Sequence, residues 1–177
     1  MLHRSIDFSD LTPPLAEVYR YWQSLPLRGG LPSWSDFDMV EIPTELIPST
    51  LVIDVADRME DNRFRFWGSG MTQVHGTDNT GNCPYDLQPP ELGERILKDQ
   101  TAIVETRQPS AGVYGFVSAR GYQEAQSLLR LPLSDTGERV DQIVIVVEIN
   151  RTVMEEMQRT GMIMHQAIDR LSGKPGG

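Results

Sequence analysis

The sequence predicts an α+β domain built around a five-stranded antiparallel sheet with short helices on one face. Three observations support this fold class. Two runs rich in β-branched and aromatic residues lie close together at residues 51–67, and a Gly- and Pro-rich stretch with short helical patterns follows at 68–109. Three further strand patterns then end near residue 149. The 177 residues suffice for one domain with its own core.

Residues 1–50 are expected to form an N-terminal helical extension that packs on this core. Pro13 and Pro14 suit the first turn of a helix, where a missing N–H group costs little. Leu15, Val18 and Trp22 follow at helical spacing. Gly and Pro residues beyond position 25 then interrupt the segment repeatedly, so the remainder should form loops and short turns.

The first two strands are predicted at residues 51–55 and 63–67. The first run is β-branched, and the second alternates basic and aromatic residues with a period of two. The polar linker between them, 57–62, is short enough for an antiparallel hairpin. The longest helix of the following block is expected from Glu91 to Val104, with Leu92, Ile96, Ile103 and Val104 on its apolar face.

Three more strands are predicted at residues 112–117, 125–133 and 142–149. Asp135 and Gly137 mark a turn between the last two, because Asp bonds to its own backbone and Gly accepts positive φ. The run 143–147 is apolar on both faces and should lie centrally in the sheet. The sheet domain is therefore expected to span residues 51–149.

A C-terminal helix is predicted over residues 150–172, followed by a flexible tail at 173–177. Its apolar stripe includes Val153, Met157, Met164 and Ile168. Methionine side chains suit adaptable apolar surfaces, which favours a homodimer formed through this helix. The alternative is that the helix covers the open face of its own sheet.

Charge and cysteine content limit the function classes. The formal net charge of −9 argues against a nucleic-acid partner, which would require clustered Lys and Arg. No apolar run is long enough to span a membrane, and the first residues show no secretory signal, so we expect a cytoplasmic protein. Cys83 is the one cysteine, which excludes an internal disulfide, and no metal site is expected. Without a catalytic constellation, we also expect no enzymatic activity.

The order of the predicted elements resembles that of the PAS domain, a sensory and interaction fold. The closest likeness is to small stand-alone PAS-like proteins common in alphaproteobacteria. It rests on the segments Arg63–Gly70, Gly76–Gly81 and Leu129–Asp135, within a similarity over residues 20–149. The resemblance implies a non-catalytic sensory or regulatory module that binds a small molecule or mediates protein association in signalling.

Two residues are candidates for cofactor binding, although the cofactor, if any, stays unknown. The segment 81–88 resembles the flavin-binding motif of the light-sensing LOV subclass, and Cys83 falls at the position of its reactive cysteine. Pro84 replaces the motif's arginine, and a small buried cysteine is the alternative interpretation. His75 lies where some PAS proteins place a haem ligand, although a lone histidine is more often a surface or capping residue.

A ligand pocket between sheet and helices is the remaining candidate site. Its predicted lining residues are Trp67, Met71, Tyr85, Tyr114, Phe116, Gln126 and Arg130. An apolar cavity with a few polar groups is the usual form of a small-molecule site. Plain core packing of the same aromatic residues is the alternative, and it predicts a pure homodimerisation or protein-interaction module with a filled core. A signalling protein is a further possible partner.

Overall fold

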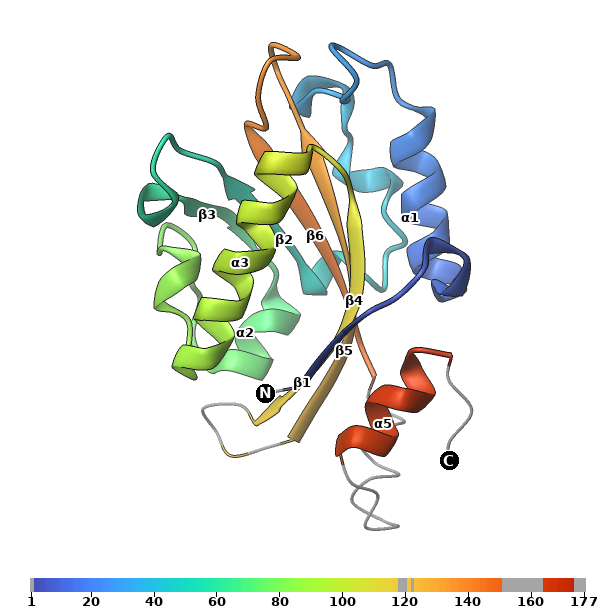
Figure 1. The fold of residues 1–177 in the computed structure, drawn as a ribbon, viewed down its shortest axis with the longest axis vertical. Helices are drawn as coiled ribbons and strands as arrows, with labels where there is room; N and C mark the ends of the chain where they lie inside the picture. Colours follow the sequence, from blue (N-terminus) through green and yellow to red (C-terminus); the bar gives the residue numbers. More distant parts are fainter. Residues whose placement is uncertain (1, 118–120, 122, 151–163, 174–177) are drawn as a thin grey trace.

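A computed structural model describes residues 2–117, 121, 123–150 and 164–173. Its centre is a six-stranded antiparallel sheet with the strand order β1-β4-β5-β6-β2-β3 (Figure 1). Two strands, a helical block and three meandering strands follow one another along the chain, so the predicted α+β architecture is confirmed. The strands and helices have these bounds: β1 Leu2–Ser5, α1 Pro13–Ser24, β2 Thr50–Asp54, β3 Arg63–Trp67, α2 Ser69–His75, α3 Pro90–Thr106, β4 Ser110–Val117, β5 Gln123–Leu133, β6 Gln142–Ile149 and α5 Met164–Leu171.

Strands β2 and β3 form the predicted hairpin, but its register shifts between Val52 and Ile53. Val52 pairs with Phe66 and Ile53 with Phe64, so the register skips Arg65, whose side chain still pairs with Asp54 of β2 at 2.7 Å. The extra residue breaks the expected period-two alternation of β3. The apolar side chain of Phe66 is consequently 36% exposed, whereas that of Phe64 is buried.

The helical block between β3 and β4 covers one face of the sheet (Figure 1). Helix α2 ends at Gly76, whose φ of 79° allows its N–H group to bond the Thr72 carbonyl. Helix α3 buries the predicted residues Leu92 and Ile103. Short 3-10 helices connect the elements: η1 Phe8–Asp10, η2 Trp34–Asp36, η3 Met39–Glu41, η4 Ile47–Ser49, η5 Met59–Asp61 and η6 Pro84–Asp86.

Strand β6 lies between β5 and β2, as its doubly apolar sequence predicts. Helices α1 and α5 lie on the face of the sheet opposite α2 and α3 (Figure 1). The indole Nε1 of Trp22 on α1 donates to the Pro132 carbonyl of β5 at 3.1 Å. Among the described residues, no helix has the length and apolarity needed to cross a membrane.

The N-terminal residues depart from the sequence prediction. Residues 2–5 form an edge strand, β1, paired with Gly112–Gly115 of β4, so the sheet has six strands rather than five. The sequence Leu2-His3-Arg4-Ser5 carries no strand pattern. The segment is extended because its backbone pairs with β4. The boundary at residues 50/51 stays a prediction, although β1 shows that the leading segment is not entirely helical.

Candidate functional site

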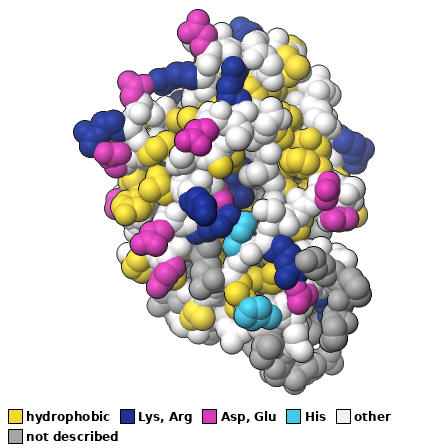
Figure 2. Space-filling model, viewed as in Figure 1, with side chains coloured by type: hydrophobic (Ala, Val, Ile, Leu, Met, Phe, Trp, Pro, Cys, Tyr) yellow, Lys and Arg dark blue, Asp and Glu magenta, His cyan; other side chains and the backbone are white. Residues whose placement is uncertain are grey.

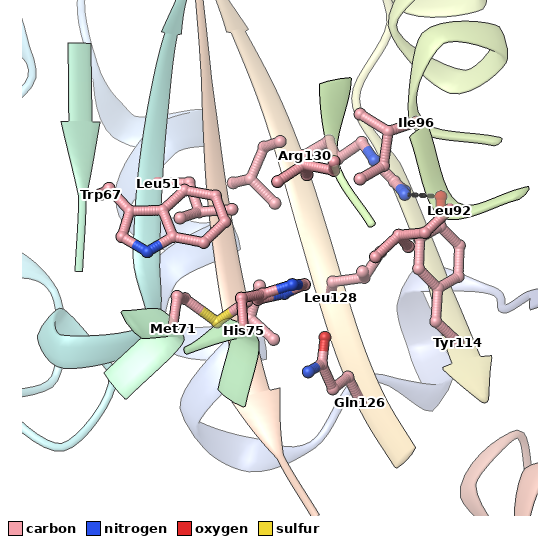
Figure 3. Close-up of a pocket in the computed structure, with 13 residues that line it drawn as sticks. Leu51, Trp67, Met71, His75, Leu92, Ile96, Tyr114, Gln126, Leu128 and Arg130 are labelled. Atoms are coloured by element: carbon pink, nitrogen blue, oxygen red, sulfur yellow. Dashed lines mark hydrogen bonds between the residues drawn. The ribbon is translucent and has the colours of Figure 1, made fainter. Parts of the chain in front are cut away.

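A small pocket lies between the sheet and helices α2 and α3 (Figure 3). Sheet residues at alternate positions of β5 and β6 face it, because successive side chains of a strand point to opposite faces. The helices close it with Met71 and His75 of α2 and with Leu92 and Ile96 of α3. The full lining is Leu51, Trp67, Met71, His75, Leu87, Leu92, Ile96, Tyr114, Gln126, Leu128, Arg130, Ile145 and Val147.

The pocket is largely filled by its own side chains. The centre of a water molecule can occupy about 30 Å³ of it. One water needs roughly 10–15 Å³ by this measure, so the space holds about two. Drug-sized ligands occupy pockets of roughly 300–1,000 Å³. A ligand larger than water would therefore require lining side chains to move, and Met71 is the most adaptable of them.

Two hydrogen-bond donors of the pocket have no acceptor among the described residues. They are Nε1 of Trp67 on β3 and Nε2 of Gln126 on β5. Trp67 is 5% exposed and Gln126 is 3% exposed. A buried donor without an acceptor costs about 1–3 kcal/mol. Both N–H groups are therefore available to an acceptor atom that enters the pocket.

His75 is held in the pocket wall by two aromatic rings. Its imidazole contacts Trp67 edge-on at 5.2 Å between centroids and stacks on Phe116 at 5.9 Å. Burial lowers the pKa of His75 to about 4, so the imidazole is neutral at pH 7. It can therefore accept or donate a hydrogen bond but adds no charge to the pocket.

A charged network closes the pocket edge beside α3. Asp99 accepts hydrogen bonds from Arg130 at 2.9 Å, from Arg95 at 2.7 Å and from the Tyr114 hydroxyl. Burial alone would raise the pKa of Asp99, but Arg130, Tyr114 and Arg95 together lower it. Burial also raises the pKa of Tyr114 to about 12, which keeps the phenol protonated as a donor to Asp99. Two guanidinium groups thus share one carboxylate.

The structure brings together five of the seven residues predicted for the pocket: Trp67, Met71, Tyr114, Gln126 and Arg130. Tyr85 does not line it and is 47% exposed, because it lies in η6 with its side chain turned to solvent. Phe116 is buried and stacks on His75, but it does not line the pocket itself. The assignment of a ligand to this lining stays a prediction.

The two cofactor candidates occupy different surroundings. His75 lines the pocket, whereas Cys83 is buried just before η6 and is absent from the lining. The free space of about 30 Å³ is too small for an isoalloxazine ring or a haem. The residues as packed therefore do not fit either group, and the LOV-like position of Cys83 is not matched by a place for flavin beside it.

Of the four residues predicted for the dimer contact of the C-terminal helix, the structure describes two. Val153 and Met157 lie outside the described residues. Met164 and Ile168 belong to α5 and lie directly over Gly115 of β4, whose missing side chain makes room for them. Ile168 is 3% exposed within this one chain. The described part of the helix thus covers its own sheet, which was the alternative to a dimer contact.

Sequence reasoning missed the charged residues of α3. Arg95 and Asp99 fall between Leu92, Ile96 and Ile103 on the helix face that meets the sheet. A charged pair four residues apart within an apolar stripe was the available signal. His3 was also missed, because β1 itself was not predicted.

Comparisons with known proteins give matches only at the level of structure. No family profile and no curated protein matches the chain. Among solved structures, a LOV domain studied with a flavin analogue matches with a TM-score of 0.46 and 16% identity, over 63% of this chain and 84% of that chain. LOV domains are a subfamily of the PAS domains. The narrower likeness to alphaproteobacterial PAS-like proteins receives no support from these matches.

Two further matches are to larger proteins. The VqmA dimer of Vibrio cholerae matches with a TM-score of 0.49 and 9% identity, over 66% of this chain and 53% of that one. An RNA-binding LOV receptor matches with a TM-score of 0.48 and 16% identity, over 77% of this chain. This chain spans 41% of that receptor chain.

These matches overturn the partner prediction. It named a small-molecule ligand, a homodimer and a signalling protein as partners and excluded nucleic acid and a membrane. The exclusion of nucleic acid, which these matches contradict, rested on net charge. The matched structures include VqmA in a ligand–DNA complex and the RNA-binding receptor. The exclusion of nucleic acid, which rested on the net charge of −9, is withdrawn.

Proposed function

We propose that this chain is a PAS-like sensory module whose inner pocket binds a small, largely apolar molecule carrying a hydrogen-bond acceptor. The observation that carries the proposal is the pair of unpaired donors, Trp67 Nε1 and Gln126 Nε2, in an otherwise apolar lining. An acceptor atom placed beside either N–H group would relieve the cost of that unpaired donor. Because the lining itself supplies mostly apolar contacts, the remainder of the ligand should be apolar.

The polar groups favour binding over catalysis. The imidazole of His75 is neutral and fixed by ring contacts, and Asp99 is engaged by three donors at the pocket edge. Neither group is placed as a free base or nucleophile. The ligand would thus be retained and released unchanged, as a sensory role requires.

The alternative is a protein-interaction module with a filled core. The free volume of about 30 Å³ favours it, since two waters could satisfy Trp67 and Gln126 without any ligand. The two functions differ in whether a molecule larger than water enters the pocket.

Two experiments distinguish the ligand-binding function from the filled-core function. The first is native mass spectrometry of the freshly purified protein. The second is thermal-shift screening with neutral apolar metabolites that carry a carbonyl or ring nitrogen. We expect a retained mass or a ligand that raises the melting temperature of the wild type. That shift should be smaller in Gln126→Met and unchanged in Gln23→Met, an exposed position on α1. No retained mass and no stabilising compound would leave the filled-core function in its place.

A further inference from the structure

A second hollow lies outside the inner pocket, between α3, β1 and the start of β4. The centre of a water molecule can occupy about 270 Å³ of it, far more than in the inner pocket. Its apolar lining is formed by Ala102, Ile103, Pro109 and Ala111. This groove is therefore large enough for a small organic molecule without rearrangement of the chain.

The charge of the groove is opposite to that of the whole protein. Arg95, Lys98 and Arg130 line it together with one carboxylate, Asp99, which gives a formal charge of +2. Burial, followed by the nearby charge of Arg95, lowers the pKa of His3 to about 4, so this lining residue is neutral. Figure 2 shows dark-blue and cyan side chains gathered near the middle of this face. A positive groove on a chain of net charge −9 attracts anions locally.

One carboxylate, Asp99, only partly neutralises the three positive groups of the groove. Asp99 already accepts hydrogen bonds from Arg95, Arg130 and Tyr114. Nε of Arg95 has no acceptor in the part of the chain that the structure describes, but it is closed to solvent, so an anion in the groove would meet the terminal nitrogens of the guanidinium. Lys98 is exposed and forms no ion pair with any described residue. The groove thus offers one lysine ammonium and one partly used guanidinium to an incoming anion.

We propose that this groove binds a small organic carboxylate, with Lys98 and Arg95 contacting the carboxylate and the side chains of Ala102, Ile103 and Pro109 contacting its hydrocarbon part. A guanidinium matches the planar geometry of a carboxylate. The site lies on the outer side of Arg130 and does not depend on a ligand in the inner pocket.

Isothermal titration of the full-length protein at low ionic strength tests this assignment with benzoate and succinate as probes, each compared with its neutral amide. We expect a carboxylate to bind at least about tenfold more tightly than its amide, since hydrogen bonds to charged groups carry that difference. Lys98→Gln should weaken binding about two- to fivefold. Arg20→Gln, which removes an exposed charge from α1, should leave it unchanged.

Ala102→Trp fills the groove without altering charge and should abolish binding while the protein stays folded by circular dichroism. Equal affinity for acid and amide, no binding of either, or equal losses in Lys98→Gln and Arg20→Gln would overturn the proposal. Inorganic phosphate binding as tightly as both carboxylates would also overturn it, because the groove would then be a general anion patch. Failure of the inner-pocket screen leaves these outcomes unaffected.

Discussion

Replacing Gln126 with methionine should stabilise the protein in the absence of ligand. The Nε2 group of Gln126 has no acceptor, and the residue is 3% exposed in an apolar pocket. Methionine has a similar length and no polar hydrogen. Removing a buried donor that costs about 1–3 kcal/mol, less some loss of packing, leaves a net gain of about 1 kcal/mol. For a chain of this size, that gain corresponds to about 2–4 °C in melting temperature.

Gln100→Met provides a matched control of opposite sign. Gln100 is equally buried at 1% exposed, and its Nε2 is likewise unpaired, but its Oε1 accepts a hydrogen bond from Asn62 Nδ2 at 3.1 Å. The substitution removes one unpaired donor and leaves another on Asn62, while the hydrogen bond itself is lost. We therefore expect Gln100→Met to be about 1 kcal/mol less stable than the wild type.

Urea unfolding of both variants measures the two changes, using protein that native mass spectrometry shows to be free of retained molecules. A loss of stability in Gln126→Met as large as that in Gln100→Met would refute the reasoning. It would mean that the Gln126 amide has a good acceptor in the ligand-free protein, and the pocket would then offer no unmet donor to a ligand.

Three further predictions concern other parts of the site. Because burial lowers the pKa of His75 from 6.5 to about 4, its contribution to stability is complete above pH 6.5 and falls as the pH decreases toward 4. When the pH falls from 6.5 to 5, the unfolding free energy of the wild type should decrease by about 2 kcal/mol more than that of His75→Phe, as measured by denaturant titration. Equal decreases would contradict the lowered pKa of His75. Asp99→Asn leaves Arg130, 2% exposed, without its carboxylate and should cost about 3–5 kcal/mol in urea unfolding; a cost below about 1 kcal/mol would show that Asp99 is not needed there. In Gly115→Ala, the new Cβ would lie 2.5 Å from Met164 Sδ and 2.7 Å from Ile168 Cδ1, so hydrogen exchange in α5 should become faster; unchanged exchange would show that α5 does not rest on Gly115.

The sequence was sufficient for the features that depend on local pattern. The runs around 51–67 and 112–149 carry strand periodicity, and α3 carries an apolar stripe, so their places in the sheet and helical layer could be predicted. The predicted pocket residues Trp67 and Gln126 both lie on predicted strands, and the structure places both in the pocket lining. Tyr85 was expected in the pocket but lies outside it. Its orientation depends on the 3-10 turn of η6, which no periodicity in the sequence marks.

The remaining features depend on contacts between segments far apart in the chain. Strand β1 exists because β4 supplies its hydrogen-bond partners, and the free volume of the pocket depends on how Met71 and His75 pack against the sheet. The groove forms only where β1 approaches α3. Neither the 30 Å³ inner space nor the positive groove could therefore be predicted before the elements were assembled.

Strand β1 gives the missed residues a common structural role. Successive side chains of a strand point to opposite faces, so His3 and Arg4 reach different layers. The His3 ring contacts Tyr114 at 5.0 Å between centroids and lies 3.2 Å from an Arg95 nitrogen, in the groove. Arg4 pairs with Asp169 and donates to Ser172 at 2.9 Å, at the end of α5.

The two faces of the sheet are therefore connected through neighbouring residues of a four-residue edge strand. A short edge strand is held by few hydrogen bonds and belongs to the less stable parts of a fold. Because His3 and Arg4 share this short backbone segment, loss of the β1–β4 pairing would remove His3 from the groove and Arg4 from α5 together.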